Sequence, residues 1–452
     1  MKIIIVGAGK VGLALAQSLS REHSVTVIDQ NPRLVEHTVN VYDVMGVCGN
    51  GASAEVLKEA DAGRTELLIA TAPSDELNIL ICLVAKYLGA EYTIARIRHP
   101  EYGEQLRYMR STLGLSMAIN PERATAREIA RVLRYPNAMK VESFSKGRLE
   151  LVEYRLDPGS TLDGMRLSSL QKSLKAKVLI CAVARNEETI IPSGDFVLQV
   201  GDTIYITASA HELEQFFRHL GVFKSKASSV MIVGASKLCY YLGAQLLEMG
   251  MTVKIIEQDA ERSTRMSELL PRALVITGDG ADSELLREEG LDQTDGFVSI
   301  TGMDEANILM SLSVARQNPN CKVITKINRQ PLVDLVAGAG LIGSVVSTGS
   351  VTTELILQYV LAMQNASGAQ IKTLHRLIGG KVEALEFGIH PDSPLIGVPL
   401  RDLKLRPGVL LAGIVRQSGK IVIPSGSDTI SAGDDVIVVA TSTLHDIRDI
   451  LR

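Results

Sequence analysis

The sequence predicts an α/β fold class in which two doubly wound parallel sheets are each followed by a small α+β domain. Two observations lead to this prediction. Short β-branched segments alternate with amphipathic helical segments near the start of the chain, a pattern typical of a parallel sheet with helices on both faces. The same arrangement then occurs a second time, so that the units follow the order A, B, A′, B′.

Four matches define the repeat of unit A. Their separation stays between 227 and 229 residues, and coincidence would not preserve register over such a distance. The matched segments are Lys2-Ile3-Ile4-Ile5-Val6-Gly7-Ala8 with Ser229-Val230-Met231-Ile232-Val233-Gly234-Ala235; Val25-Thr26-Val27-Ile28-Asp29 with Val253-Lys254-Ile255-Ile256-Glu257; Gly49-Asn50-Gly51-Ala52 with Gly278-Asp279-Gly280-Ala281; and Asp75-Glu76-Leu77-Asn78-Ile79-Leu80 with Asp304-Glu305-Ala306-Asn307-Ile308-Leu309.

Unit A contains the strands of the predicted parallel sheet, and unit B contains short strands separated by Gly, Pro and Asp turns. Unit B also repeats, most clearly where Ile191-Pro192-Ser193-Gly194 matches Ile423-Pro424-Ser425-Gly426. The expected strands of the first unit A are 2–6, 25–28, 43–48, 67–70 and 92–97, and the expected terminal helices of B and B′ are 211–219 and 444–451. We therefore expect four domains, at 1–136, 137–221, 228–348 and 368–452.

The segment Gly7-Ala8-Gly9-Lys10-Val11-Gly12 is a GxGxxG motif placed between a strand and an apolar helix, which predicts a Rossmann-like nucleotide site. Gly7 allows the tight turn, Gly9 lets the backbone approach a pyrophosphate, and Gly12 lets the helix pack against the strand. The amino end of the helix offers free N–H groups and a partial positive charge to phosphate.

Asp29 ends the second expected strand, 22 residues after Gly7. A carboxylate at this position can accept hydrogen bonds from both hydroxyls of an adenosine ribose, and it would repel a 2′-phosphate, so NAD is favoured over NADP. The alternative is an aspartate at the sheet edge beside a glycine turn that serves packing alone.

Further candidate residues follow the later strands, at the edge where open α/β sheets bind their ligands. They are Asn50 after the third strand, Thr71-Ala72-Pro73 after the fourth, and Arg98 after the fifth. Arg98 could reach a phosphate in its own site or in a neighbouring subunit; its alternative is a solvated surface arginine.

The second glycine loop departs from the motif. It reads Gly234-Ala235-Ser236-Lys237-Leu238-Cys239, so only the first glycine remains, and Ser236 and Cys239 occupy the second and third glycine positions. Glu257 keeps the carboxylate at the end of the second strand, and Asp279 stands where Asn50 stands in the first half. The second half is therefore either a site for a mononucleotide or NAD, or a degenerate copy kept as scaffold.

Composition excludes several classes of function. The net charge is −4, so a nucleic-acid partner is not expected. The five cysteines are scattered and form no CxxC, which argues against a disulfide framework or a zinc site, and we expect no metal. The longest apolar runs have seven residues, whereas a membrane-spanning helix needs about 20. Membrane association is therefore expected only through a partner.

No catalytic constellation accompanies the glycine loop. The sequence has no YxxxK pair, no GxSxG elbow and no Walker lysine loop, and His99 is a lone loop histidine. A nucleotide site without catalytic groups beside it indicates a sensor, so we expect no enzyme activity. The alternatives are an NAD-dependent dehydrogenase of a small metabolite and a nucleotide-sensing regulator of another cation transporter.

The duplicated architecture and these motifs resemble the TrkA family of peripheral regulatory subunits of bacterial Trk potassium uptake systems. Unit A is similar to the N-terminal domain of the RCK (regulator of potassium conductance) module, and unit B to its C-terminal domain. The residues that carry the resemblance are the Gly7 to Gly12 loop, Asp29, Ser74-Asp75-Glu76 with Asn78, Ala95-Arg96-Ile97-Arg98, and the paired IPSG…GD turns of B and B′.

The resemblance implies a cytoplasmic homo-oligomer, a dimer or a tetrameric ring, on the inner face of the cell membrane. Its implied partner is a membrane potassium-translocating subunit of the TrkH/TrkG type, which it would gate. The implied ligands are NAD(H) and, in addition, ATP and ADP.

Overall fold

The computed structural model describes residues 1–102, 113–135, 138–174, 176–186, 188–221, 228–338, 344–366, 371–444 and 446–452. The expected domain boundaries at 136–137 and within 222–227, and the expected start of the last domain at 368, lie outside the described residues. The chain forms two compact units that interleave along the sequence: Met1–Ile129 with Ser229–Leu357, and Ala130–Ser228 with Gln358–Arg452.

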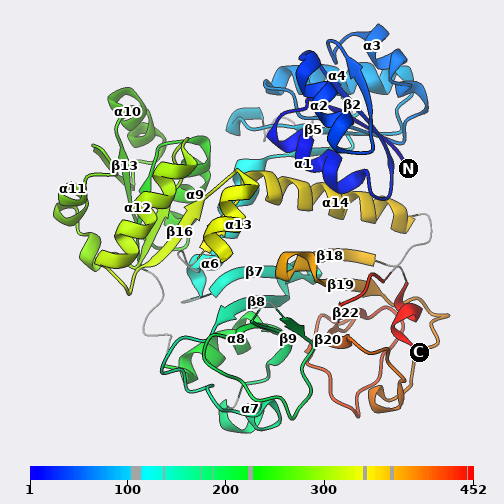
Figure 1. Cartoon of the computed structure of the whole chain (residues 1–452), viewed down its shortest axis with the longest axis vertical. Helices are drawn as coiled ribbons and strands as arrows, with labels where there is room; N and C mark the ends of the chain where they lie inside the picture. The colour runs from blue at the N-terminus through cyan, green and yellow to red at the C-terminus, as the bar shows by residue number, and fades with distance from the viewer. Residues whose placement is uncertain are drawn as a thin grey trace. The chain divides into compact units, whose positions relative to one another are not determined.

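The first unit contains two six-stranded sheets in which every neighbouring pair of strands is parallel (Figure 1). The first has the order β3-β2-β1-β4-β5-β6 and the second the order β14-β13-β12-β15-β16-β17. In each sheet the chain adds strands on one side of β1 or β12 and then crosses to add the later strands on the other side. The crossing point, between β1 and β4 or between β12 and β15, is the switch point of a Rossmann-like sheet. The strands are β1 Lys2–Val6, β2 Ser24–Asp29, β3 Met45–Cys48, β4 Leu67–Ala70, β5 Tyr92–Arg96, β6 Met117–Ile119, β12 Ser229–Val233, β13 Thr252–Glu257, β14 Leu274–Thr277, β15 Gly296–Ser299, β16 Lys322–Lys326 and β17 Ser344–Val346.

Helices connect these strands because apolar residues recur at helical spacing between them, as Leu15, Ala16 and Leu19 do on the buried face of α1. The helices of the first half are α1 Lys10–Leu19, α2 Pro32–Val41, α3 Ala54–Glu59, α4 Asp75–Leu88 and α6 Pro121–Arg134, with a 3₁₀ turn η1 at Ala62–Arg64. The second half has α9 Lys237–Glu248, α10 Ala260–Leu269, α11 Ser283–Glu288, η3 Leu291–Gln293, α12 Asp304–Gln317, α13 Gln330–Gly338 and α14 Thr348–Ala366.

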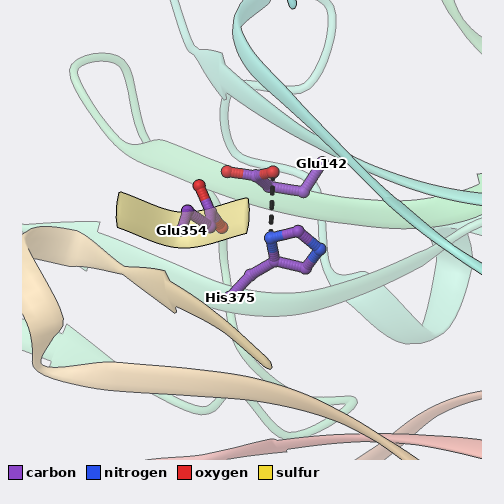
Figure 2. Close-up of side chains that lie close together, drawn as sticks. All are labelled: Glu142, Glu354 and His375. Atoms are coloured by element: carbon purple, nitrogen blue, oxygen red, sulfur yellow. Dashed lines mark ion pairs between the residues drawn. The ribbon is translucent and has the colours of Figure 1, made fainter. Parts of the chain in front are cut away.

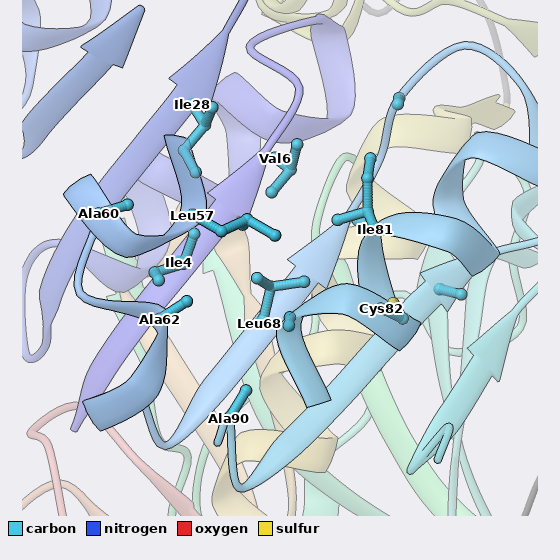
Figure 3. Packing of buried hydrophobic residues seen from close by; sticks show 14 of the residues in the cluster. Ile4, Val6, Ile28, Leu57, Ala60, Ala62, Leu68, Ile81, Cys82 and Ala90 are labelled. Atoms are coloured by element: carbon cyan, nitrogen blue, oxygen red, sulfur yellow. The ribbon is translucent and has the colours of Figure 1, made fainter. Parts of the chain in front are cut away.

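One core of the first half lies between the sheet and the helices α3 and α4 (Figure 3). Alternate residues of β1, Ile4 and Val6, point into this core, where they meet Leu57 of α3 and Ile81 of α4. Because the strands are apolar on both faces, helices must cover both sides of the sheet. This packing fixes the carboxyl ends of β1, β2 and β4 next to one another.

The second unit contains two antiparallel sheets of five strands each, in the orders β10-β9-β11-β8-β7 and β18-β19-β22-β20-β21. The strands are β7 Ala138–Phe144, β8 Leu149–Arg155, β9 Leu179–Arg185, β10 Glu188–Ile190, β11 Thr203–Ser209, β18 Ile371–Leu377, β19 Val382–Gly388, β20 Val409–Val415, β21 Ile421–Val422 and β22 Asp435–Ala440. The shorter elements are α7 Leu167–Leu174, α8 Ala210–His219, η2 Ser145–Gly147, η4 Ile378–Gly380, η5 Leu400–Asp402 and η6 Ile447–Ile450.

The fold class predicted from the sequence is confirmed, with differences at individual elements. The expected helix at 444–451 is wrong: the described residues there form only the 3₁₀ turn Ile447–Ile450, which Asp446 caps. The expected strand at 43–48 begins at Met45, because the residues just before it leave α2 in a turn. The three-residue strand β6 was not predicted, because it is too short to show alternation.

Candidate functional site

The first glycine loop holds a conformation that depends on glycine. Gly7 has φ of +104°, in the region that favours glycine, and its N–H donates to the carbonyl of Ile28 at 2.8 Å. A Cβ added at Gly12 would lie 1.8 Å from the Gly7 carbonyl oxygen, so the helix can pack this closely only without a side chain there. The loop is thus held against β2 on one side and α1 on the other.

Gly9 leaves the amino end of α1 open. It is the N-cap residue of α1 and provides no side-chain hydrogen bond to the helix, and a Cβ built on it would meet nothing within 4 Å. The first N–H groups of a helix have no partner within the helix, and together they favour an anion. The geometry therefore suits a phosphate group beside Gly9.

Asp29 lies beside this open loop. Its Oδ2 accepts a hydrogen bond from the Ala8 N–H at 2.7 Å, and its Oδ1 accepts one from the Asn31 N–H at 2.8 Å. Each carboxylate oxygen has a second lone pair, so both can still accept bonds from a pair of ribose hydroxyls. The two backbone bonds fix the carboxylate in position without a ligand.

The residues that follow β3 and β4 lie at the same edge of the sheet. The Thr71 hydroxyl donates to the carbonyl of Gly7 at 3.1 Å, which ties the end of β4 to the glycine loop. Ala72 is buried and Pro73 is exposed. Asn50 is exposed, and its Oδ1 accepts from the Ala52 N–H at 3.0 Å, so this side chain shapes a turn.

Arg98 forms an ion pair with an acidic side chain. Its guanidinium lies 2.5 Å from Glu122 Oε1, at the start of α6. Arg96, two residues earlier, donates from its guanidinium to the carbonyl of Ala72 at 2.8 Å. The Arg96 Nε is buried without a hydrogen-bond partner, and burial lowers the pKa of this side chain.

Arg96 is therefore a candidate binding residue that sequence reasoning did not select. A signal for it exists in the repeat, because Lys326 ends β16 as Arg96 ends β5. Burial also lowers the pKa of Lys326, and its ammonium donates to the carbonyl of Ile300 at 3.3 Å. A partly buried cation thus ends the same strand in both halves, near Asp75 in the first and Asp304 in the second.

The second half repeats the carboxylate and differs at the loop. Glu257 Oε2 accepts from the Ala235 N–H at 2.6 Å, as Asp29 does from Ala8. Ser236 is the N-cap of α9, and its hydroxyl accepts from the Cys239 N–H at 3.4 Å. The helix end that Gly9 leaves open in the first half is therefore partly occupied by the protein's own side chain in the second half.

The remaining predicted positions of the second half also differ in their surroundings. Lys237 is exposed, Leu238 is buried, and Asp279 Oδ1 accepts from the Ala281 N–H at 2.9 Å, which repeats the turn formed by Asn50. Cys239 is fully buried where the first half has Gly12. A side chain at this position requires the second loop to lie farther from its helix than the first loop does.

Comparison with known proteins identifies the domains. Residues 3–121 and 230–348 match the TrkA-N domain, and residues 151–221 and 384–452 match the TrkA-C domain. The chain is 32% identical over 444 residues to the Trk system potassium uptake protein TrkA of Vibrio alginolyticus, a match that covers 97% of this chain and 95% of that protein. This chain belongs to the TrkA family.

Other members of the TrkA family match over similar lengths. The Trk system potassium uptake protein TrkA homolog 1 of Methanosarcina mazei is 31% identical over 452 residues, with 98% of each chain covered. The family fold also occurs in solved structures. The GsuK RCK domain has a TM-score of 0.62 at 21% identity, with 98% of this chain and 92% of that chain covered, and the GsuK channel bound to NAD has 0.63 at 20%, with 98% and 77% covered.

Two further observations bear on the family assignment. Among the residues that the structure describes, no helix combines the length and the apolar character needed to cross a membrane. The TrkA-N matches span the strands of the two parallel sheets, and the TrkA-C matches span the two antiparallel sheets except for their first strands, β7 and β18. The duplication seen in the sequence is therefore a tandem of two complete family modules.

Proposed function

We propose that this chain is a nucleotide-sensing regulatory subunit of a potassium uptake system. Its first parallel sheet binds NAD(H), and nucleotide occupancy gates a membrane potassium-translocating subunit of the TrkH/TrkG type. The observation that carries the proposal is the arrangement of Asp29 beside the open glycine loop, with its carboxylate 2.7 Å from the Ala8 N–H and the amino end of α1 uncapped. Family membership supports the potassium system.

The site chemistry selects the ligand. A pyrophosphate would lie at Gly9 and accept from the free N–H groups of α1, while the ribose hydroxyls would donate to Asp29. A 2′-phosphate would meet the Asp29 carboxylate and be repelled, so NAD(H) is favoured over NADP(H). ATP and ADP share the adenosine and phosphate groups and are proposed as further ligands. Arg96 would supply a positive charge at the end of β5.

The other proposed binding positions differ in how directly they would contact the nucleotide. In the first half, Thr71 and Ala72 would contact the ligand beside the loop, and Asn50, Pro73 and Arg98 would contribute at the edge of the site. In the second half, Glu257 would hold a ribose, but the Ser236 cap competes with phosphate for the end of α9. We therefore propose that the second half binds nucleotide more weakly than the first.

The proposed role is regulatory rather than catalytic. The chain would act as a homo-oligomer on the cytoplasmic face of the membrane, attached through its partner. A ligand shifts such an assembly only if it binds two conformations with different affinity. NADH binding by this chain without turnover on offered carbonyl substrates is the expected biochemical behaviour.

Binding is tested by titrating NADH calorimetrically into the intact protein and its Asp29→Ala variant. Losing hydrogen bonds to a charged acceptor costs roughly 1.5–3 kcal/mol, so the Kd for NADH rises by roughly 10- to 150-fold. Asp43→Ala, which removes an exposed carboxylate before β3, is the matched control and keeps the original affinity. Glu257→Ala reports the second half separately. An unchanged NADH affinity in Asp29→Ala would contradict the assignment.

A further inference from the structure

The two antiparallel sheets of the second unit have the same arrangement of strands, and their positions correspond residue by residue. Strands β7 and β18 both carry an irregularity near their start, and both end in a turn whose first residue has positive φ, 49° at Ser145 and 51° at Ile378. Their pairing registers also agree, since Glu142 lies opposite Leu151 and His375 lies opposite Ala384. Glu142 and His375 therefore occupy the same position in the two copies.

The two copies share one buried core built from equivalent positions. Residues of both sheets belong to a single apolar cluster, and its equivalent pairs are Phe144 with Leu377, Leu149 with Val382, Leu151 with Ala384, and Tyr205 with Ile437. Equivalent residues meet in this way across a twofold axis. The Thr207 hydroxyl also donates across the contact to the carbonyl of Ala412 at 2.7 Å. The second unit thus has an internal pseudo-twofold axis between its two domains.

Glu142 and His375 meet each other at this contact (Figure 2). His375 Nδ1 lies 3.0 Å from Glu142 Oε2, and the two side chains are only 5% and 8% exposed. His375 Nε2 lies 3.3 Å from the Ser143 carbonyl oxygen. Both oxygens only accept hydrogen bonds, so the doubly protonated, positively charged ring satisfies both. Two equivalent residues that contact one another mark the position of the axis, and here they carry opposite charges.

The surroundings keep the Glu142 carboxylate ionised and hold the His375 ring in place. Burial alone would raise the pKa of the Glu142 carboxyl, but the charges of His375 and Lys140 outweigh burial and hold that pKa well below its ordinary value. Lys140 forms an ion pair with the same carboxylate. The Phe144 ring packs edge-on against the imidazole, with ring centroids 4.9 Å apart.

We propose that the Glu142–His375 pair is the specificity element of this interface, and that it directs the first C-terminal domain to the second rather than to another copy of itself. On a twofold axis between identical domains, each position meets itself. Pairing of two first domains would bury two Glu142 carboxylates together, and pairing of two second domains would bury two His375 rings together. Lys140 would still pair with each Glu142 carboxylate, but two like-charged groups on the axis repel one another where Glu142 and His375 attract.

A second pair of residues supports the same preference. Glu386 accepts hydrogen bonds from Ser145, at 3.1 Å from the backbone N–H and 2.7 Å from the hydroxyl. The residue equivalent to Ser145 in the second domain is Ile378. Pairing of two second domains would therefore place Glu386 against a side chain that has no donor. Because both domains are in one chain, a high effective concentration further favours the complementary pair.

The test reverses the charges in the full-length chain. Glu142→His and His375→Glu each place like groups on the axis, and each is expected to lower Tm by roughly 5–15 °C. The double variant Glu142→His/His375→Glu restores opposite charges with reversed direction and is expected to recover more than half of that loss. If the double variant loses as much Tm as the two single variants lose together, the proposal is overturned.

Co-expression keeps the test decisive even if the single variants fold poorly. A chain with Glu142→His and a differently tagged chain with His375→Glu are each self-incompatible, but each first domain is complementary to the second domain of the other chain. We expect the co-expressed pair to co-purify as a complex with a Tm near that of the original protein. Co-purification no greater than that of two differently tagged original chains, with a Tm no higher than either single variant, would also overturn the proposal.

Discussion

Gly9 and Gly12 are both part of the first glycine loop, but they constrain different things. Gly12 has no room for a side chain, because a Cβ would lie 1.8 Å from the Gly7 carbonyl oxygen. Gly9 has open space around its Cβ position and extended backbone angles that any residue can adopt. Gly12 is therefore required by the fold, and Gly9 is required only by a ligand that approaches the backbone.

This difference predicts that alanine at Gly12 lowers stability, whereas alanine at Gly9 lowers NADH affinity. Gly12→Ala should destabilise the protein by about 2 kcal/mol through overpacking, which calorimetry would detect as a fall in Tm. Gly9→Ala should change stability by less than about 0.5 kcal/mol and weaken NADH binding by about tenfold or more. Equal losses of stability in both variants would show that the open space at Gly9 is not available.

Cys48 is a natural reporter for the proposed site. All five cysteines are free and lie in the described residues, and only Cys48 is exposed. Burial raises the pKa of Cys82, Cys181 and Cys321 to about 12 and also raises that of Cys239. Cys48 lies beside Asp29 in the pairing of β2 with β3.

We expect one fast-reacting thiol per folded chain with an aromatic disulfide reagent at pH 8, because the thiolate is the reactive form and the buried thiols remain protonated. Saturating NADH should slow the reaction at Cys48, and all five thiols should react after denaturation. The reaction is followed by absorbance, with Cys48→Ser as control. A rate at Cys48 that is indifferent to NADH would argue against adenosine lying at the end of β2.

Helices α4 and α12 show why the Asp-Glu-x-Asn segment repeats. Asp75 Oδ2 accepts from the N–H groups of Arg98 and His99 at 2.9 and 2.8 Å, and Asp304 Oδ2 accepts from Asn328 and Arg329 at 3.0 Å each. The Asn78 and Asn307 side chains donate to the carbonyls that end β5 and β16. These carboxylates and amides fasten each helix to the end of the neighbouring strand.

Asp75→Ala should therefore destabilise the first parallel sheet, because it leaves two partly buried N–H groups without their acceptor. We expect a loss of roughly 2–4 kcal/mol, measured by urea unfolding. Asp75→Asn keeps an acceptor oxygen at the same place and should lose less than half as much. If the Asn variant were as unstable as the Ala variant, the negative charge rather than the two hydrogen bonds would be the essential property.

The whole molecule combines two copies of each domain that have diverged in complementary ways. The parallel sheets differ at the loop, where Gly9 is matched by Ser236, and the antiparallel sheets differ on their shared axis, where Glu142 is matched by His375. Duplication within one chain allows each copy to change separately. A homodimer of single modules would have to change both copies together.

At this scale the expected physiological result concerns potassium uptake. Rubidium uptake, as a surrogate, should fall in cells that lack the gene and return when the intact gene is restored. The Asp29→Ala variant should restore uptake with an altered response to energy state, while Asp43→Ala should behave as the original. Uptake that is indifferent to deletion would contradict the potassium role for this chain.

The sequence alone determined the fold class, the duplication and the positions of the glycine loops, because strand alternation, glycine spacing and repeat register are local properties. It also selected Asp29, whose distance along the chain from Gly7 is characteristic. Only the tertiary structure decided which side chains already have a partner within the protein. It paired Arg98 with Glu122, directed Arg96 to Ala72, and brought Glu142 to His375 across the pseudo-twofold axis. Such pairings join residues far apart in sequence, and packing rather than local pattern sets their distance.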